Sequence, residues 1–333
     1  MFQTHMVGHL WDLVDEGLEG VLDLLHGTLG VTGLCTPVTA GPMRSLRYAA
    51  DVEPRIFRSR GGVFFQPDRA LYENTRCKPI LSEWLKTRNP LQKLAQSCRE
   101  RGLALRAVIE CTSIGRIAAH DPHFARKDVF GDLSPSQICL VNADVAEFIR
   151  ASALDVCKNY ALDTLELTGL DAMTPAAEDP AGEPGLGGRQ LLALCFCESC
   201  KQAAAAAGVD VEAAARSTTV RLDTVFRTGQ PITPPLTTIA ADDPPLSAFL
   251  AWYHARITEL LSTIRSLCGC RILVHTGPRH AGNDEEFTTE YASGVDGVVC
   301  DFVGWETTAL ERLIARMRLT PGTAQRLEVQ LPV

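Results

Sequence analysis

The feature that most constrains the fold of this chain is a repeated alternation of short apolar runs with longer amphipathic runs. The apolar runs have the length of buried strands. They occur at Met6–Trp11, Val31–Thr36, Leu103–Ile109, Leu162–Thr168, Arg271–His275, Gly297–Phe302 and Gln325–Leu331. Helical runs between strands are typical of parallel strands joined by helical crossovers. We therefore expect an α/β fold.

Two of the helical runs carry clear end signals. Asn89 and Pro90 are typical of an N-cap followed by proline at the first helical position, and Gly102 has the place of a C′ glycine. Asn142 is a second candidate N-cap. The helices are expected at Val14–His26, Leu91–Arg101, Ala143–Tyr160, Leu246–Leu267 and Thr307–Arg318.

The length of 333 residues fits one large barrel. We expect a single (β/α)8 TIM-like barrel domain over residues 1–333, with long loop insertions at 37–88, 110–141 and 169–245. A small hairpin is expected at Gly61–Asp68. Seven strands are visible where a closed barrel needs eight. A strand is therefore missed, the chain is a fragment, or the barrel is incomplete or irregular at its C-terminus.

Charge and hydropathy exclude several classes of partner. The net charge is −8 and no run of Lys or Arg stands out, so no nucleic-acid surface is expected. No apolar stretch approaches the roughly 20 residues of a membrane span. The start, MFQTHMVGHLWDLVDEG, lacks the pattern of a signal peptide, so we expect a cytoplasmic protein. A homo-oligomer stays open.

The sharpest motif is a Cys-x-Cys-x-x-Cys spacing formed by Cys195, Cys197 and Cys200. Three thiolates at this spacing can converge on one tetrahedral ion, and thiolates suit zinc. A closed structural site needs a fourth ligand, for which Cys139 and Cys111 are the candidates. Three unliganded thiols at a helix start, or a redox site, are the alternatives.

The chain has 12 cysteines in all, and most of the others are scattered. Cys268 and Cys270 stand close together in the sequence. Those inside apolar runs are expected to be small buried hydrophobic residues. They are Cys35, Cys98, Cys157 and Cys300.

Five segments carry a family resemblance. The runs ICLVNADVAEFIRASALDVCKNYALDTLELTG and LLALCFCESCKQAA resemble a group of bacterial glycoside-hydrolase-like (β/α)8-barrel proteins. The pieces HLWDLVDEG, GGVFFQPDRALYENTRCKP and IGRIAAHDPHFARKDVFGD are also similar, so the resemblance covers most of residues 1–205. The cysteine motif also resembles the zinc site of a beta-galactosidase family, which implies Cys139 as the fourth ligand.

The sequence departs from that galactosidase family at one important place. The family has an Asn-Glu pair at the end of strand four, where the Glu is the acid/base. This chain reads LELTGLDAM there, with Glu166 but no Asn-Glu pair. The following loop, TPAAEDPAGEPGLGG, has no His. The departure concerns catalysis and leaves the expected fold unchanged.

Barrel enzymes place catalytic groups at the carboxyl ends of their strands. Glycoside hydrolysis needs one carboxylic acid and one carboxylate. We expect Glu166 to be the acid, because a carboxylate in an apolar strand is costly without a role or a partner. The alternative is an ion pair with an arginine inside the barrel, such as Arg106. Asp301 is the expected second carboxylate, and Glu328, which matches the strand-seven nucleophile of related barrels, is its alternative.

Four further residues are expected to bind substrate: Trp11, Asp12, Glu110 and His275. Trp11 could stack on a sugar ring and Asp12 could bind hydroxyls, but a helix-capping Asp beside a core Trp is the alternative. His275 is otherwise a satisfied barrel histidine.

The resulting hypothesis is hydrolysis of a glycosidic bond by a carboxylate pair. The alternatives are a catalytically inactive sugar-binding or metal-stapled barrel, and a metal-dependent hydrolase using His275, His9 and Asp301. The sequence has no Walker motif, no GxGxxG after a strand and no GxSxG.

Overall fold

A computed structural model describes residues 3–49, 52–170, 184–275, 294–301 and 327–330, and of residues 300, 301 and 327–330 it describes the backbone alone. Its main element is a sheet of seven parallel strands. In spatial order these are β1 (His5–Val7), β2 (Gly33–Pro37), β7 (Ala104–Glu110), β10 (Thr164–Thr168), β11 (Arg271–His275), β12 (Gly297–Asp301) and β13 (Leu327–Gln330). Spatial order follows chain order, as in a (β/α) barrel.

The seven expected strands are therefore present, with shifted ends in all but β11. The described strand pairs end at β1 on one side and β13 on the other, so closure into eight strands stays a prediction. The expected first strand was too long, because it ends at Val7 and α1 (Leu10–Asp15) begins three residues later. The expected helix at Thr307–Arg318 lies outside the described residues.

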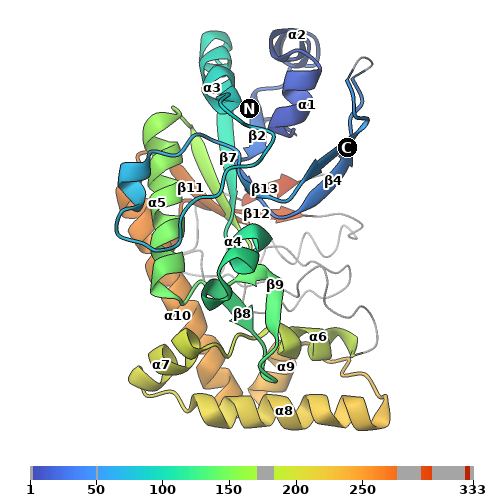
Figure 1. Ribbon diagram of the computed structural model, residues 1–333, viewed down its shortest axis with the longest axis vertical. Coiled ribbons are helices and arrows are strands. Elements are labelled where there is room, and N and C mark those ends of the chain that lie inside the picture. Colours follow the sequence, from blue (N-terminus) through green and yellow to red (C-terminus); the bar gives the residue numbers. More distant parts are fainter. Residues whose placement is uncertain (1–2, 50–51, 171–183, 276–293, 302–326, 331–333) are drawn as a thin grey trace.

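Three long helices pack on one face of the sheet: α3 (Pro90–Arg101), α5 (Ala143–Asn159) and α10 (Pro244–Leu267) (Figure 1). The alternating strand residues Leu105, Ala107, Ile109, Leu165 and Leu167 are buried in the same core. Because side chains alternate between faces, the residues between them point to the opposite, polar face.

The expected caps of two helices are confirmed. The Asn89 side chain accepts a hydrogen bond from the Gln92 amide, and Gly102 ends α3 in the left-handed conformation with φ 68°. The Asn142 side chain accepts from the first amides of α5. Each such cap satisfies backbone donors that the helix leaves without partners.

The long helix α10 begins earlier than expected, at Pro244, because Asp243 caps it. The Asp243 carboxylate accepts from the Leu246 amide, from Arg221 at 3.0 Å and from the Ser217 hydroxyl. Burial opposes ionisation of this carboxyl group, but these hydrogen bonds lower its pKa below the ordinary value.

The remaining elements lie in the connections. Before α3 these are α2 (Leu18–Asp23), η1 (Leu24–Thr28), β3 (Thr39–Ala40), β4 (Met43–Leu46), β5 (Ile56–Ser59), β6 (Gly62–Val63) and η2 (Arg69–Tyr72). The hairpin expected at Gly61–Asp68 is wrong. Its β6 instead pairs antiparallel with β3, and the hairpin of this region is β4–β5.

Two insertions follow the carboxyl ends of β7 and β10. The first contains α4 (Gly115–His120), η3 (Pro122–Phe124), β8 (Ala125–Lys127) and β9 (Leu133–Ile138). The second contains α6 (Gly185–Ala193), α7 (Glu198–Ala206), α8 (Val211–Thr228) and α9 (Leu236–Ala241). Figure 1 shows these elements gathered beyond one end of the sheet, with α8 farthest from it. The insertions are therefore folded and can build a site there.

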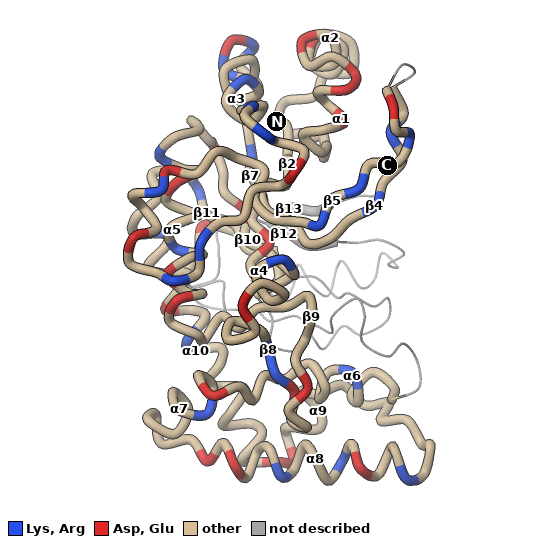
Figure 2. The backbone as a smooth tube through the Cα atoms, viewed as in Figure 1, with Lys and Arg blue, Asp and Glu red and all other residues tan. Residues whose placement is uncertain are grey.

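The charges show no single-sign face along the described backbone. Lys and Arg alternate with Asp and Glu over most elements (Figure 2). Within the described ranges, no helix combines the length and the apolar character needed to cross a bilayer.

Candidate active site and four-thiol site

The polar face of the sheet holds a buried charged group centred on Glu166. Arg106 Nη1 donates to Glu166 Oε2 at 3.1 Å, and His275 Nδ1 lies 3.5 Å from Glu166 Oε1. The three residues come from the adjacent strands β7, β10 and β11. The side chains of Arg106 and Glu166 are 6% and 4% exposed, and that of His275 is 19% exposed. Both carboxylate oxygens thus face a nitrogen in a nearly dry environment.

The Arg106 contact places a guanidinium group directly beside the Glu166 carboxyl group. A guanidinium at hydrogen-bond distance stabilises a carboxylate as the anion. The charge of Glu166 also acts on Cys35. Cys35 lies in β2 and is the register partner of Arg106 in β7. Burial, with the Glu166 charge as a further cause, raises the pKa of the Cys35 thiol to about 12. Cys35 is therefore a neutral neighbour of the ion pair.

The two other expected carboxylates are placed by their backbones alone. Asp301 ends β12, and Glu328 lies in β13 opposite Val299. Val299 in turn pairs with His275 of β11. Both side chains lie outside the described part of the chain, so their roles stay predictions.

Trp11 is a core residue in this structure. It is 1% exposed, and its ring stacks on His9 at 4.0 Å and on Phe57 at 4.2 Å between ring centroids. Both faces of the indole are therefore covered, which favours the core alternative over a sugar platform. Asp12 follows in the first turn of α1, where burial and the nearby Asp15 raise its pKa.

Glu110 uses one carboxylate oxygen to organise the loop after β7. Its Oε1 accepts from the amides of Thr112 and Ser113, each at 3.0 Å, and from the Thr112 hydroxyl at 3.1 Å. Gly169, at φ +75°, approaches so closely that a Cβ there would lie 1.9 Å from Oε1. Glu110 therefore joins the loops after β7 and β10, and its expected role in binding substrate stays a prediction.

The four-thiol site brings together Cys139, Cys195, Cys197 and Cys200. Cys139 follows β9, and the other three lie between α6 and the first turn of α7. All four are buried, and their Sγ atoms lie within 4.8 Å of one another. Cys111, the other candidate for the fourth ligand, is not in this group.

The sulfur positions fit a tetrahedral ion. With a Zn–S bond of about 2.3 Å, the edge of a regular tetrahedron of sulfurs is about 3.8 Å. Cys139 Sγ lies 3.5 Å from the Sγ atoms of both Cys197 and Cys200. Hydrogen bonds from the neighbouring thiols, first that of Cys139, lower the pKa of Cys195, and the charge of Arg126 acts in the same direction. The donor set therefore fits a thiophilic cation such as zinc.

The four-thiol site is linked to the β8–β9 hairpin. The Phe196 amide donates to the Lys127 carbonyl at 2.7 Å, and the Lys127 amide donates to Cys195 Sγ at 3.5 Å. The preceding Arg126 is 4% exposed and donates to Gln137 Oε1 at 2.8 Å and to the carbonyl at the end of α6. These hydrogen bonds join the β8–β9 hairpin to the end of α6 and to the segment that carries Cys195.

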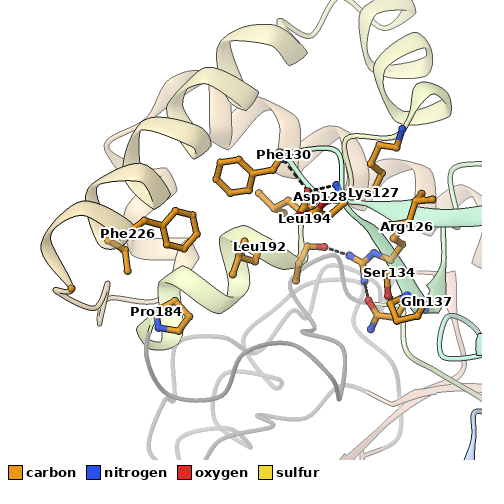
Figure 3. Close-up of a pocket in the computed structure, with 16 residues that line it drawn as sticks. Arg126, Lys127, Asp128, Phe130, Ser134, Gln137, Pro184, Leu192, Leu194 and Phe226 are labelled. Carbon is orange, nitrogen blue, oxygen red and sulfur yellow. Dashed lines mark hydrogen bonds between the residues drawn. The ribbon is translucent and has the colours of Figure 1, made fainter.

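A cavity of about 1080 Å³ lies between this hairpin, α6 and the end of α8 (Figure 3). Arg126, Asp128 and Gln137 contribute polar groups to its lining. Phe130 and Phe226 line it from opposite insertions, with ring centroids 5.6 Å apart and planes tilted by 47°. Its volume is that of a small-molecule site. Sequence reasoning missed this cavity, because its walls come from insertions that were expected to be loops.

The metal-dependent alternative gains no support from the described side chains. His9 stacks on Trp11 and does not join His275 in a cluster of ligand atoms. Within the described ranges, the four thiols are the one group of ligand atoms close enough to hold a metal.

No protein-family model matches the chain, and a comparison with curated protein sequences finds no match. Among solved structures, the chain is similar to the glycoside hydrolase domain of PgaB (BpsB) from Bordetella bronchiseptica. The TM-score is 0.53 at 12% identity, over 97% of this chain and 82% of that domain. A beta-galactosidase from the psychrophilic Marinomonas ef1 aligns with a TM-score of 0.49 at 11% identity, over 91% of this chain and 41% of that enzyme. The chain spans about two fifths of that enzyme's length. The PgaB likeness shows that the chain shares the fold of that domain.

Proposed function

We propose that this chain hydrolyses a glycosidic bond at the carboxyl end of its sheet, with Glu166 as an ionised carboxylate. The observation that carries the proposal is the position of Glu166 between Arg106 and His275, on the polar face of a fold of the glycoside hydrolase type. Glycosidases work with a pair of carboxyl groups in different protonation states.

The contact with Arg106 changes the role that we assign to Glu166. The sequence predicts a general acid, and we propose instead that Glu166 works as the charged partner of Arg106. An anionic Glu166 suits a nucleophile, a general base or a group that stabilises an oxocarbenium ion. The acid would then be Asp301 or Glu328, whose strands follow β11 in the sheet.

We further propose that the cavity binds the sugar chain. Phe130 and Phe226 supply aromatic surface for the apolar faces of sugar rings, and Asp128 and Gln137 supply acceptors for hydroxyls. A zinc ion on the four thiols would be structural, since a closed set of four protein ligands leaves no open position for catalysis. Its role would be to hold the β8–β9 wall of the cavity in place.

The test is turnover of a broad panel of aryl glycosides by the wild type and by Glu166→Gln. We expect the substitution to lower kcat by at least about 100-fold, since positioned carboxyl groups contribute about that much or more. Glu212→Gln is the matched control, because it removes the same charge from the surface of α8, where its partner is Lys201. Circular dichroism shows whether each variant is folded. Equal turnover in the folded Glu166→Gln variant would refute the catalytic role.

A second candidate is a barrel that binds sugar without cleaving it. It is favoured by the 4% exposure of the Glu166 side chain, since a deeply buried ion pair also suits a purely structural role. This candidate predicts no turnover by the wild type on any glycoside. It also predicts oligosaccharide binding that Phe226→Ala weakens and Glu166→Gln leaves unchanged.

A further inference from the structure

A second group of thiols lies apart from the four-thiol site. Cys157 is in the last turn of α5, Cys268 follows the end of α10, and Cys270 directly precedes β11. All three residues are partly exposed, whereas the cysteines of the four-thiol site are buried. The sequence led us to expect Cys157 to be a small buried hydrophobic residue, and its partial exposure differs from that expectation.

One contact in this group joins Cys157 and Cys270, whose Sγ atoms are 3.1 Å apart. A disulfide bond is about 2.05 Å long, so the two sulfurs need to approach by only about 1 Å. α5 and α10 pack against each other (Figure 1). This packing keeps the last turn of α5, which carries Cys157, close to the segment after α10, which carries Cys270. The pair is therefore held in place by the fold and stays accessible to small reagents.

We propose that Cys157 and Cys270 are an oxidisable pair that forms a disulfide when the protein meets a small-molecule disulfide. The Cys270 thiolate attacks one sulfur of the reagent and expels one small thiolate, which leaves a mixed disulfide on Cys270. The Cys157 thiol then gives its proton to solvent, attacks the Cys270 sulfur and expels the second small thiolate. The protein loses two electrons and two protons, and the reagent becomes two small thiols.

We assign the attacking role to Cys270. A hydrogen bond with Cys157 lowers the pKa of Cys270, whereas hydrogen bonds with Cys268 and Cys270 raise that of Cys157. A thiol with a lowered pKa supplies more thiolate, which is the nucleophile in exchange reactions. Cys157 is then the resolving thiol.

The crosslink would tie the end of α5 to the start of β11. The two cysteines are 113 positions apart, and the whole second insertion lies between them. A crosslink over a loop of this length restrains the unfolded chain strongly, so we expect oxidation to raise the unfolding temperature by about 5 °C or more. Cys270 directly precedes the amino end of β11 and His275 lies at its carboxyl end, so the crosslink and the His275 contact to Glu166 are at opposite ends of this strand.

The experiment treats the reduced, full-length protein with oxidised glutathione, alkylates the remaining thiols and maps the peptides by mass spectrometry. We expect a peptide pair joined through Cys157 and Cys270 and lighter by two hydrogens than the reduced pair. Cys268→Ser should keep this product, and Cys157→Ser should lose it and keep a glutathione adduct on Cys270. Cys98→Ala, which removes a buried thiol elsewhere, is the matched control.

Three results would overturn the proposal. The first is a disulfide-linked peptide pair from the wild type that contains Cys268 in place of Cys270. The second is wild-type protein that carries glutathione adducts but no internal disulfide. The third is an unfolding temperature that is lower after oxidation than before it. All three are measured on the wild type, so they do not depend on any variant folding.

Discussion

The buried pair of Arg106 and Glu166 gives the sharpest prediction for stability. Replacing Arg106 by Met keeps an unbranched, flexible side chain and removes the guanidinium charge, which leaves Glu166 in a nearly dry site. With side-chain exposures of 6% and 4%, solvent screens the pair little. Removing one partner of such a pair costs about 3–5 kcal/mol, because the remaining charge loses its compensation. We therefore expect Arg106→Met to lower the free energy of unfolding by that amount.

Urea unfolding of four proteins measures this value: the wild type, Arg106→Met, Glu166→Leu and the double variant. The double variant should be more stable than Arg106→Met alone, because two apolar side chains replace an unpaired charge. The reasoning fails if Arg106→Met costs less than about 1 kcal/mol with an unchanged denaturant slope. Such a result would mean that water reaches Glu166.

Three further predictions follow from other parts of the structure. Cys139→Ser should lower bound zinc, measured by atomic emission, from about one ion per chain toward none, with a loss of stability on the order of several kcal/mol. Equal zinc content in this variant would contradict the four-thiol site. Phe226→Ala should weaken oligosaccharide binding about 10-fold by calorimetry, whereas Val220→Ala, exposed on the same helix, should not. Asp243 has a lowered pKa, so its contribution to stability is present above its ordinary pKa of 3.8 and is lost as the pH falls through the lower folded value. Asp243→Asn should therefore flatten the acid limb of the stability curve, and an identical acid limb in that variant would contradict the assignment.

Much of the sheet could be predicted from the sequence, since buried parallel strands appear as short apolar runs. The run Arg271–His275 coincides with β11. The predicted end of the first strand was wrong, because apolar residues such as Leu10 and Trp11 fit a buried strand and the buried face of a short helix equally well. A run of this length does not distinguish the two.

The candidate site could be predicted only in part. The isolated charge of Glu166 in an apolar strand indicates a role or a partner, and an ion pair with an arginine inside the barrel, such as Arg106, is the alternative to catalysis; the contact between the two residues is present. The cavity could not be predicted, because Phe130 and Phe226 lie 96 positions apart and meet only when two insertions fold against each other. The contact between Cys157 and Cys270 depends on the packing of α5 against α10 for the same reason.

An experimental structure with a bound oligosaccharide tests the proposed function most directly. We predict sugar density that runs from the cavity to the polar face of the sheet, with a scissile bond beside Glu166. A second carboxyl group, from Asp301 or Glu328, should lie about 5–10 Å from Glu166, the range that glycosidases use. Sugar bound elsewhere, or no acid within that distance, would contradict the account.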